Sequence, residues 1–70
     1  MATVSITSEY ITLGQLLKDE GVVDSGGAAK YFLANNQVQV NGELDDRRGR
    51  KLYPGDSVEA AGQQFTVAKA

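Results

Sequence analysis

The first half of the chain changes from a two-residue apolar period to a helical one. Residues 3–7 alternate polar and apolar side chains, which predicts a short strand. Thr12 then begins a helix, because Thr12 and Gln15 have the spacing of a capping box. Gly21 suits the end of this helix. The apolar stripe of the helix consists of Leu13, Leu16 and Leu17.

A second helix is predicted to begin at Ser25 and to run to Asn35 or Asn36. Serine is a favoured residue at the N-cap, where its hydroxyl accepts from a free backbone amide. The apolar residues that follow are at helical spacing: Ala28, Ala29, Phe32 and Leu33. Residues 22–24 join the two helices, so the pair should form a compact hairpin.

From Val38 onward the apolar period returns to two residues. Asn41-Gly42 is a strong signal for a tight hairpin turn. Residues 57–60 and 65–68 read as a closing hairpin. One strand, two helices and then several strands indicate an α+β domain, in which a helix pair packs on a small curved antiparallel sheet. A chain of 70 residues predicts one domain, residues 1–70.

The composition narrows the classes of function. The chain contains no cysteine and no histidine, so it has no disulfide, no thiolate and no imidazole base or ligand. Asp45 and Asp46 are consecutive in a polar segment, with no sign of a pocket that would tune them as acid and base. We therefore expect no enzyme, no metal, no cofactor and no small-molecule substrate. The N-terminus lacks a signal peptide, and no segment reaches about 18 apolar residues, so we expect a cytoplasmic monomer without membrane contact.

The net charge of −2 conceals an uneven distribution. Residues 1–46 carry 2 basic and 7 acidic side chains, whereas residues 47–70 carry 5 basic and 2 acidic ones. Four of these five cations lie in residues 47–51. Local potential rather than the total decides what a surface attracts, so the overall charge is weak evidence against a polyanionic partner.

The basic segment is the first candidate binding site. It contributes Arg47, Arg48, Arg50 and Lys51. We expect residues 45–51 to form an exposed loop. Arginine forks match phosphate oxygens two at a time, which favours contact with a nucleic-acid backbone. The alternative is a solvated loop whose cations pair with Asp45 and Asp46, and the pattern leaves both interpretations open.

The beginning of the second helix is the second candidate. Ser25, Gly26 and Gly27 precede amides that have no intrahelical acceptor, at the positive end of the helix dipole. A phosphate could approach two glycines closely, and Lys30 leans back toward the same end. The alternative is that the glycines only permit close helix packing.

Three tyrosines are weaker candidates. Tyr31 lies outside the apolar stripe of the second helix and could stack on an unpaired base. The interpretation we prefer is a half-buried tyrosine at the margin of the core. The same holds for Tyr10 and Tyr53.

Three segments together resemble the S4 (S-four) RNA-binding domain family. They are SGGAAKYFL at residues 25–33, VQVNGE at 38–43 and KLYPGDSV at 51–58. The resemblance spans residues 13–58 and looks most similar to the stand-alone YaaA-like proteins. It implies an alpha-L motif and a non-catalytic protein that binds structured RNA, ribosomal or transfer. Many family members have arginines where this chain has Gly26 and Gly27, and a basic residue near Thr12, so two common contacts are missing.

The resemblance implies that RNA lies between the start of the second helix and the basic loop. VNGE and GDSV also resemble β-grasp sulfur carriers, but those proteins end in Gly-Gly and this chain ends in Lys69-Ala70. A protein–protein adaptor that uses the basic loop against an acidic partner is a further alternative.

Overall fold

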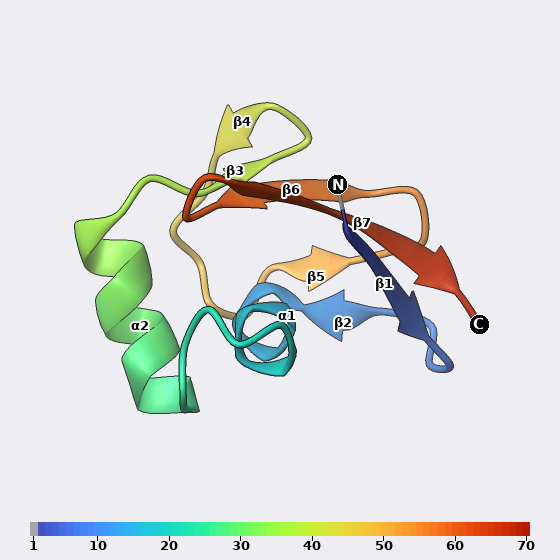
Figure 1. Ribbon diagram of the computed structural model, residues 1–70, viewed down its shortest axis with the longest axis horizontal. Coiled ribbons are helices and arrows are strands. Elements are labelled where there is room, and N and C mark those ends of the chain that lie inside the picture. The colour runs from blue at the N-terminus through green and yellow to red at the C-terminus, as the bar shows by residue number, and fades with distance from the viewer. Residues whose placement is uncertain (1) are drawn as a thin grey trace.

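The computed structural model describes residues 2–70 and shows two helices with a mixed sheet and a separate strand pair (Figure 1). The elements are β1 (Ala2–Ile6), β2 (Ile11–Thr12), α1 (Leu13–Asp19), α2 (Gly26–Asn35), β3 (Gln39–Val40), β4 (Glu43–Leu44), β5 (Lys51–Leu52), β6 (Ser57–Ala60) and β7 (Gln63–Lys69). The strand order of the sheet is β1-β7-β6-β3-β4, and β2 pairs with β5 alone. The predicted α+β class, both helices, the turn at Asn41-Gly42 and the closing hairpin are confirmed, and β7 begins two residues earlier than expected, at Gln63.

The sheet is mixed rather than wholly antiparallel. The expected antiparallel pairing holds for β3 with β4, β3 with β6 and β6 with β7. The first strand instead runs parallel to the last, with Val4 opposite Val67. Alternation in residues 3–7 indicates which side chains are buried, but it contains no information on strand direction.

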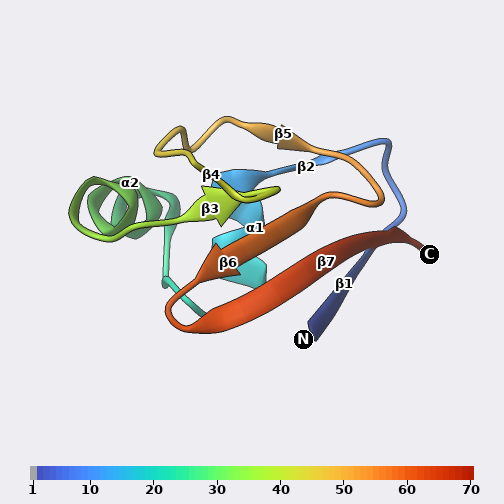
Figure 2. The same cartoon turned by 90° about the horizontal axis from the view of Figure 1, so that it is seen from above.

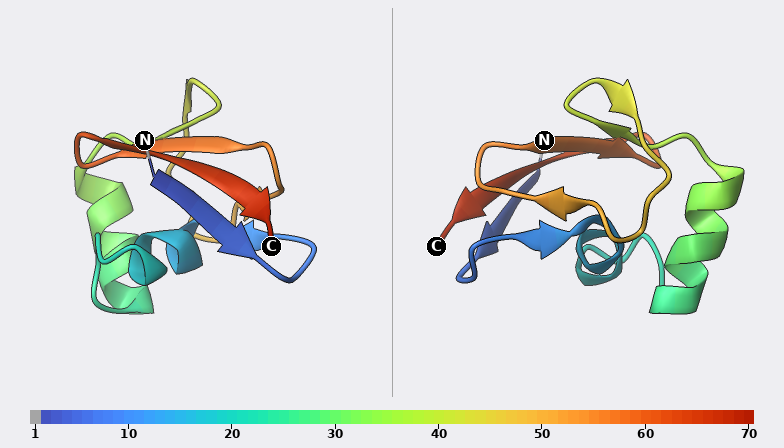
Figure 3. Two further views of the ribbon diagram at one scale, coloured as in Figure 1. Left: turned by 45° about the vertical axis from the view of Figure 1, so that its right-hand side comes forward. Right: turned by 180° about the vertical axis from the view of Figure 1, so that it is seen from behind.

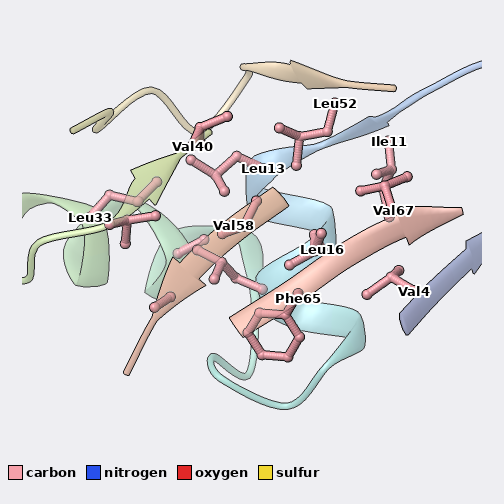
Figure 4. Close-up of a cluster of buried hydrophobic side chains, with 14 of the residues drawn as sticks. Val4, Ile11, Leu13, Leu16, Leu33, Val40, Leu52, Val58, Phe65 and Val67 are labelled. Carbon is pink, nitrogen blue, oxygen red and sulfur yellow. The ribbon is translucent and has the colours of Figure 1, made fainter. Parts of the chain in front are cut away.

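The core lies on one face of the sheet. Alternate residues of β1, β6 and β7 point inward, as expected for a sheet with one solvated face. The helices and the strand pair complete the cluster, and their side chains converge in Figure 4. The largest fully buried side chains are Phe65, Leu13, Leu16, Leu17, Leu52, Val38, Val40, Val58 and Val67.

The first helix uses part of the predicted capping box. The Thr12 hydroxyl accepts from the Gln15 amide at 3.3 Å. The Gln15 side chain donates to Asp19 at 2.7 Å, so it makes no return bond to the cap. Gly21 follows the helix with φ +77°, the left-handed conformation that glycine adopts without a steric penalty.

The second helix begins as predicted but buries a narrower stripe. The Ser25 hydroxyl accepts from the Ala28 amide at 3.1 Å, and α2 lies at one end of the sheet (Figure 1). Ala29 and Leu33 are buried. Tyr31 is 74% exposed, so its predicted half-buried position is wrong. Only the flank of α2 that carries Ala29 and Leu33 meets the core.

No helix among residues 2–70 is long and apolar enough to cross a membrane.

The pairing of β2 with β5 was not predicted. Each strand has two residues, too few for an alternating pattern to appear. Ile11 lies opposite Leu52, and both are buried. Figure 2 shows this two-stranded ribbon and the β1–β7–β6 part of the sheet on opposite sides, with α1 between them. The ribbon brings the end of the basic segment to the beginning of α1.

Candidate functional site

The basic segment is attached to the N-terminal end of α1. The Leu13 amide donates to the Arg50 carbonyl at 2.8 Å, and the Gly14 amide donates to the Arg48 carbonyl at 2.9 Å. A Cβ at position 14 would lie 2.5 Å from Cγ of Arg48. Only glycine therefore permits this approach, and the backbone of the loop is held in place. Figure 3 shows β2 running directly into α1, with β5 beside it.

Arg48 also reaches the second helix. Its Nη1 donates to the Gly26 carbonyl at 3.1 Å. The side chain makes no ion pair with a carboxylate among residues 2–70, so its other donors remain available to a ligand. The two candidate regions, which were predicted separately, thus meet at Arg48 and Gly26.

A shallow groove lies where these parts meet. It has a volume of about 240 Å³ and is lined by Thr12, Gly14, Gln15, Lys18, Gly26, Arg48 and Gly49. We call it the α1–α2 groove. Two of its lining side chains, Lys18 and Arg48, are cations. Lys18 was not among the predicted site residues, although it lies one helical turn after Gly14 on α1 and so belongs on the same side.

The N-terminal end of α2 is open. The amides of Gly26 and Gly27 have no acceptor among residues 2–70. A Cβ at Gly26 would meet nothing within 4 Å, and one at Gly27 would meet only the Ser25 hydroxyl at 4.0 Å. Close helix packing therefore does not explain the two glycines. Lys30 is exposed one turn later.

Asp45 pairs with two of the four predicted cations. It accepts from Arg47 at 3.1 and 2.8 Å and from Arg50 at 2.8 Å. Its side chain is only 6% exposed, whereas that of Arg47 is 67% exposed. Hydrogen bonds from Arg47, with smaller contributions from its backbone amide and from Arg50, hold the pKa of Asp45 well below its usual range. The same carboxylate raises the pKa of Arg47.

The pairing interpretation therefore holds for Arg47 and Arg50, both of which contact Asp45. Arg47 and Arg50 organise the loop around Asp45, and these three side chains together carry one net positive charge. Arg48 and Lys51 have no carboxylate partner among residues 2–70. Asp46 likewise forms no ion pair in this part of the chain. Lys51 lies at the far end, with Nζ 5.0 Å from the ring centre of Tyr10.

The turn sequences VNG and GDS have a structural role. Asn41 has φ +52° and donates to Asp56 at 3.1 Å. Its Oδ1 accepts from the Ser57 amide at 2.9 Å, and Asp56 accepts from the Tyr53 amide at 2.8 Å. These side chains join the β3–β4 turn to the segment that follows β5, and they lie outside the α1–α2 groove.

Comparison with known proteins agrees with the motifs. A family model described as "S4 domain" matches residues 4–68. The "Probable ribosome maturation protein RlbA" of Bacillus subtilis (strain 168) is 59% identical over 59 residues, 84% of this chain and 83% of that protein. The "Putative RNA-binding protein YbcJ" of Escherichia coli (strain K12) is 38% identical over 68 residues, 96% of this chain and 97% of that protein. The chain therefore belongs to the S4 domain family.

Proposed function

We propose that this protein binds structured RNA without catalysing a reaction, and that the RNA backbone lies in the α1–α2 groove. The observation that carries the proposal is the contact of Arg48 with Gly14 and Gly26, which assembles one cationic groove from two helix ends and a loop. Membership of the S4 family supports it, as does the printed name of the Escherichia coli relative.

The groove offers three kinds of phosphate contact. The guanidinium of Arg48 presents several donors in one plane, and Lys18 adds a point charge. The amides of Gly26 and Gly27 lie at the positive end of the α2 dipole. Lys30 leans toward that end, because side chains on a helix tilt toward its N-terminus. Phosphate contacts of this type position RNA but read little of its sequence.

The basic loop extends this surface toward β5. Arg47, Arg50 and Lys51 line a second shallow hollow of about 430 Å³ together with Gly49. Pairing with Asp45 reduces the charge that Arg47 and Arg50 offer, so Arg48 should contribute more than either. The absence of histidine and cysteine favours a non-catalytic role.

The RNA is proposed to be ribosomal, with transfer RNA as the other structured candidate. The name of the Bacillus relative, a ribosome maturation protein, favours the first. A ribosomal RNA partner implies that the protein acts in the cytoplasm. One copy of the chain contains the whole groove, so we propose that it binds as a monomer.

The first prediction is RNA binding that weakens steeply with salt. Four or five cations near phosphates should give a slope of log affinity against log salt of about −3 to −4. Fluorescence anisotropy with a labelled ribosomal RNA hairpin measures this slope. Arg48→Ala should lower the affinity about tenfold, equivalent to about 1.4 kcal/mol.

Lys69→Gln is the charge-matched control for this experiment. Lys69 donates to the carbonyls of Thr7 and Ser8 and does not line the α1–α2 groove. Its replacement should change the affinity by much less than tenfold, through the general charge alone. Equal losses for Arg48→Ala and Lys69→Gln, or a flat response to salt, would contradict the proposed function.

A further inference from the structure

The outer face of the β2–β5 ribbon carries two tyrosines. Successive side chains of a strand point to opposite faces. Ile11 and Leu52 point into the core, so the residues on either side of them face outward. Continuing the register by one residue places Tyr10 opposite Tyr53. Lys51 is on the same outer face as Tyr53.

The two rings form an exposed aromatic pair. Tyr10 is 37% exposed and Tyr53 is 48% exposed. Their ring centres lie 5.9 Å apart with the planes tilted by 48°. The Lys51 ammonium lies 5.0 Å from the centre of the Tyr10 ring, at cation–π distance. An apolar surface with its own cation is therefore available next to the basic loop.

Hydrogen bonds hold both tyrosines in place. The Tyr53 amide donates to Asp56 at 2.8 Å. The Ser8 hydroxyl donates to the Tyr10 carbonyl at 2.8 Å. The pairing of β2 with β5, which begins at the adjacent residues Ile11 and Leu52, restricts the backbone further. A ring attached to a backbone held in this way loses less conformational entropy on ligand binding than one on a mobile loop.

We propose that Tyr10 and Tyr53 form a stacking site for an unpaired RNA base, and that Lys51 binds the phosphate of the same nucleotide. The proposal rests on the proposed function and extends it to a class of substrate, RNA with unpaired nucleotides beside the bound backbone. Aromatic rings stack on bases in single-stranded sites, typically beside cations that follow the backbone.

The position of the pair relative to the groove supports this choice of ligand. Arg50 and Tyr53 are three residues apart along an extended segment, a span of about 10 Å. One RNA strand can therefore contact both the basic loop and the tyrosines. Tyr10 also lines an open hollow of about 710 Å³, whose lining includes Glu9 and Asp19 but not Lys51. These carboxylates disfavour a phosphate there, so the strand should pass on the side of Lys51.

The test compares two RNAs of equal length, a hairpin with a single-stranded extension and a fully paired hairpin. Tyr10→Leu/Tyr53→Leu should lose about tenfold in affinity for the extended RNA and little for the paired one. The salt slope should stay unchanged, because no charge is removed. Tyr10→Phe/Tyr53→Phe keeps both rings and should bind like the parent.

Tyr31→Leu is the matched control, since Tyr31 is the other exposed tyrosine and lies on α2. It should bind both RNAs like the parent. The chain has three tyrosines and no tryptophan, so a Tyr31→Phe protein reports only on the proposed pair. Its tyrosine fluorescence should be quenched by the extended RNA and not by the paired one.

Three outcomes would overturn the stacking site. If the leucine variant binds both RNAs like the parent while Arg48→Ala still weakens binding, the stacking site is refuted and the groove stands. If the leucine variant loses affinity equally for both RNAs, the tyrosines support the fold and not a base. If the parent binds neither RNA, the proposed function fails together with the stacking site.

Discussion

Gly14 and Arg48 show how one missing side chain can position a binding residue. The Cγ of Arg48 occupies the space where a Cβ at position 14 would lie, 2.5 Å away, and the Arg48 carbonyl is 3.3 Å from the same point. A substituent there must displace the arginine. In the proposed function, Gly14 would affect RNA binding by positioning Arg48 and would need no RNA contact of its own.

Gly14→Ala should weaken RNA binding about as much as Arg48→Ala, because it displaces the same side chain. Alanine favours a helix by up to about 1 kcal/mol over glycine, which offsets part of the steric cost to stability. The double variant should bind like either single variant, since residues that act through one contact are not additive. Anisotropy on all four proteins measures this cycle. Losses that add would show that Gly14 and Arg48 act independently.

Asp45 is the residue that organises the basic loop. Its buried carboxylate accepts from two arginines and from the Arg47 amide at 2.9 Å. Because these bonds favour the charged form, the pKa of Asp45 lies below its ordinary value of 3.8. The unfolded chain binds this proton more readily, so the stabilisation is present above pH 4 and is lost as the pH falls below it.

Asp45→Asn should lower the free energy of unfolding by about 1–2 kcal/mol at pH 7, since it weakens bonds to charged groups that are partly solvated. The difference from the parent should shrink below about pH 4, where Asp45 of the unfolded parent takes up a proton and the charged pairing contributes less to stability. Urea unfolding followed by circular dichroism at pH 7 and pH 3 measures both. Asp46→Asn, which removes no ion pair, should change little at either pH. A gap that is equal at both pH values would contradict the charged pairing.

At the scale of elements, two hairpins use the same turn with different residues. Asn41-Gly42 joins β3 to β4, and Ala61-Gly62 joins β6 to β7. Asn41 has φ +52° and Ala61 has φ +53°. Asparagine tolerates this region far better than alanine, so the second turn has an unfavourable residue at its first position.

Exchanging the two turn residues should have opposite effects on stability. Asn41→Ala introduces the unfavourable residue and removes bonds to Asp56 and Ser57, so it should cost about 1–3 kcal/mol of the free energy of unfolding. Ala61→Asn should stabilise by about 0.5–1 kcal/mol. Thermal unfolding checks both, and RNA affinity at low temperature should stay unchanged. Destabilisation by Ala61→Asn would contradict this account of the turn.

At the scale of the whole molecule, the fold concentrates positive charge on a protein that is acidic overall. The net charge is −2, yet Lys18 from α1 and Arg48 from the loop line the same groove. Asp45 is one of the acidic residues in the excess of residues 1–46, and two arginines of the basic loop neutralise its charge. Because screening limits the range of an exposed charge to about 10 Å at moderate salt, the charges of the groove rather than the net charge set the local potential that a polyanion meets.

Local features were predictable because their causes lie within a few residues. Caps at Thr12 and Ser25 begin both helices as expected, and the turn at Asn41-Gly42 follows from its own backbone preferences. The S4 resemblance followed from motifs that likewise consist of short segments. The alternation in residues 3–7 also agrees with the burial of Val4 and Ile6. The caps and the turn depend on interactions across four residues or fewer. The alternation depends on the periodic burial of one face of a strand.

Tertiary structure alone decided the rest. The parallel pairing of β1 with β7, the two-residue strands of the ribbon and the contact of Arg48 with Gly26 join segments far apart in sequence, the last across 22 residues. The exposure of Tyr31 depends on how far the core extends beneath α2. Such contacts form only when folding closes long loops, and their stabilisation comes from packing that no local pattern contains.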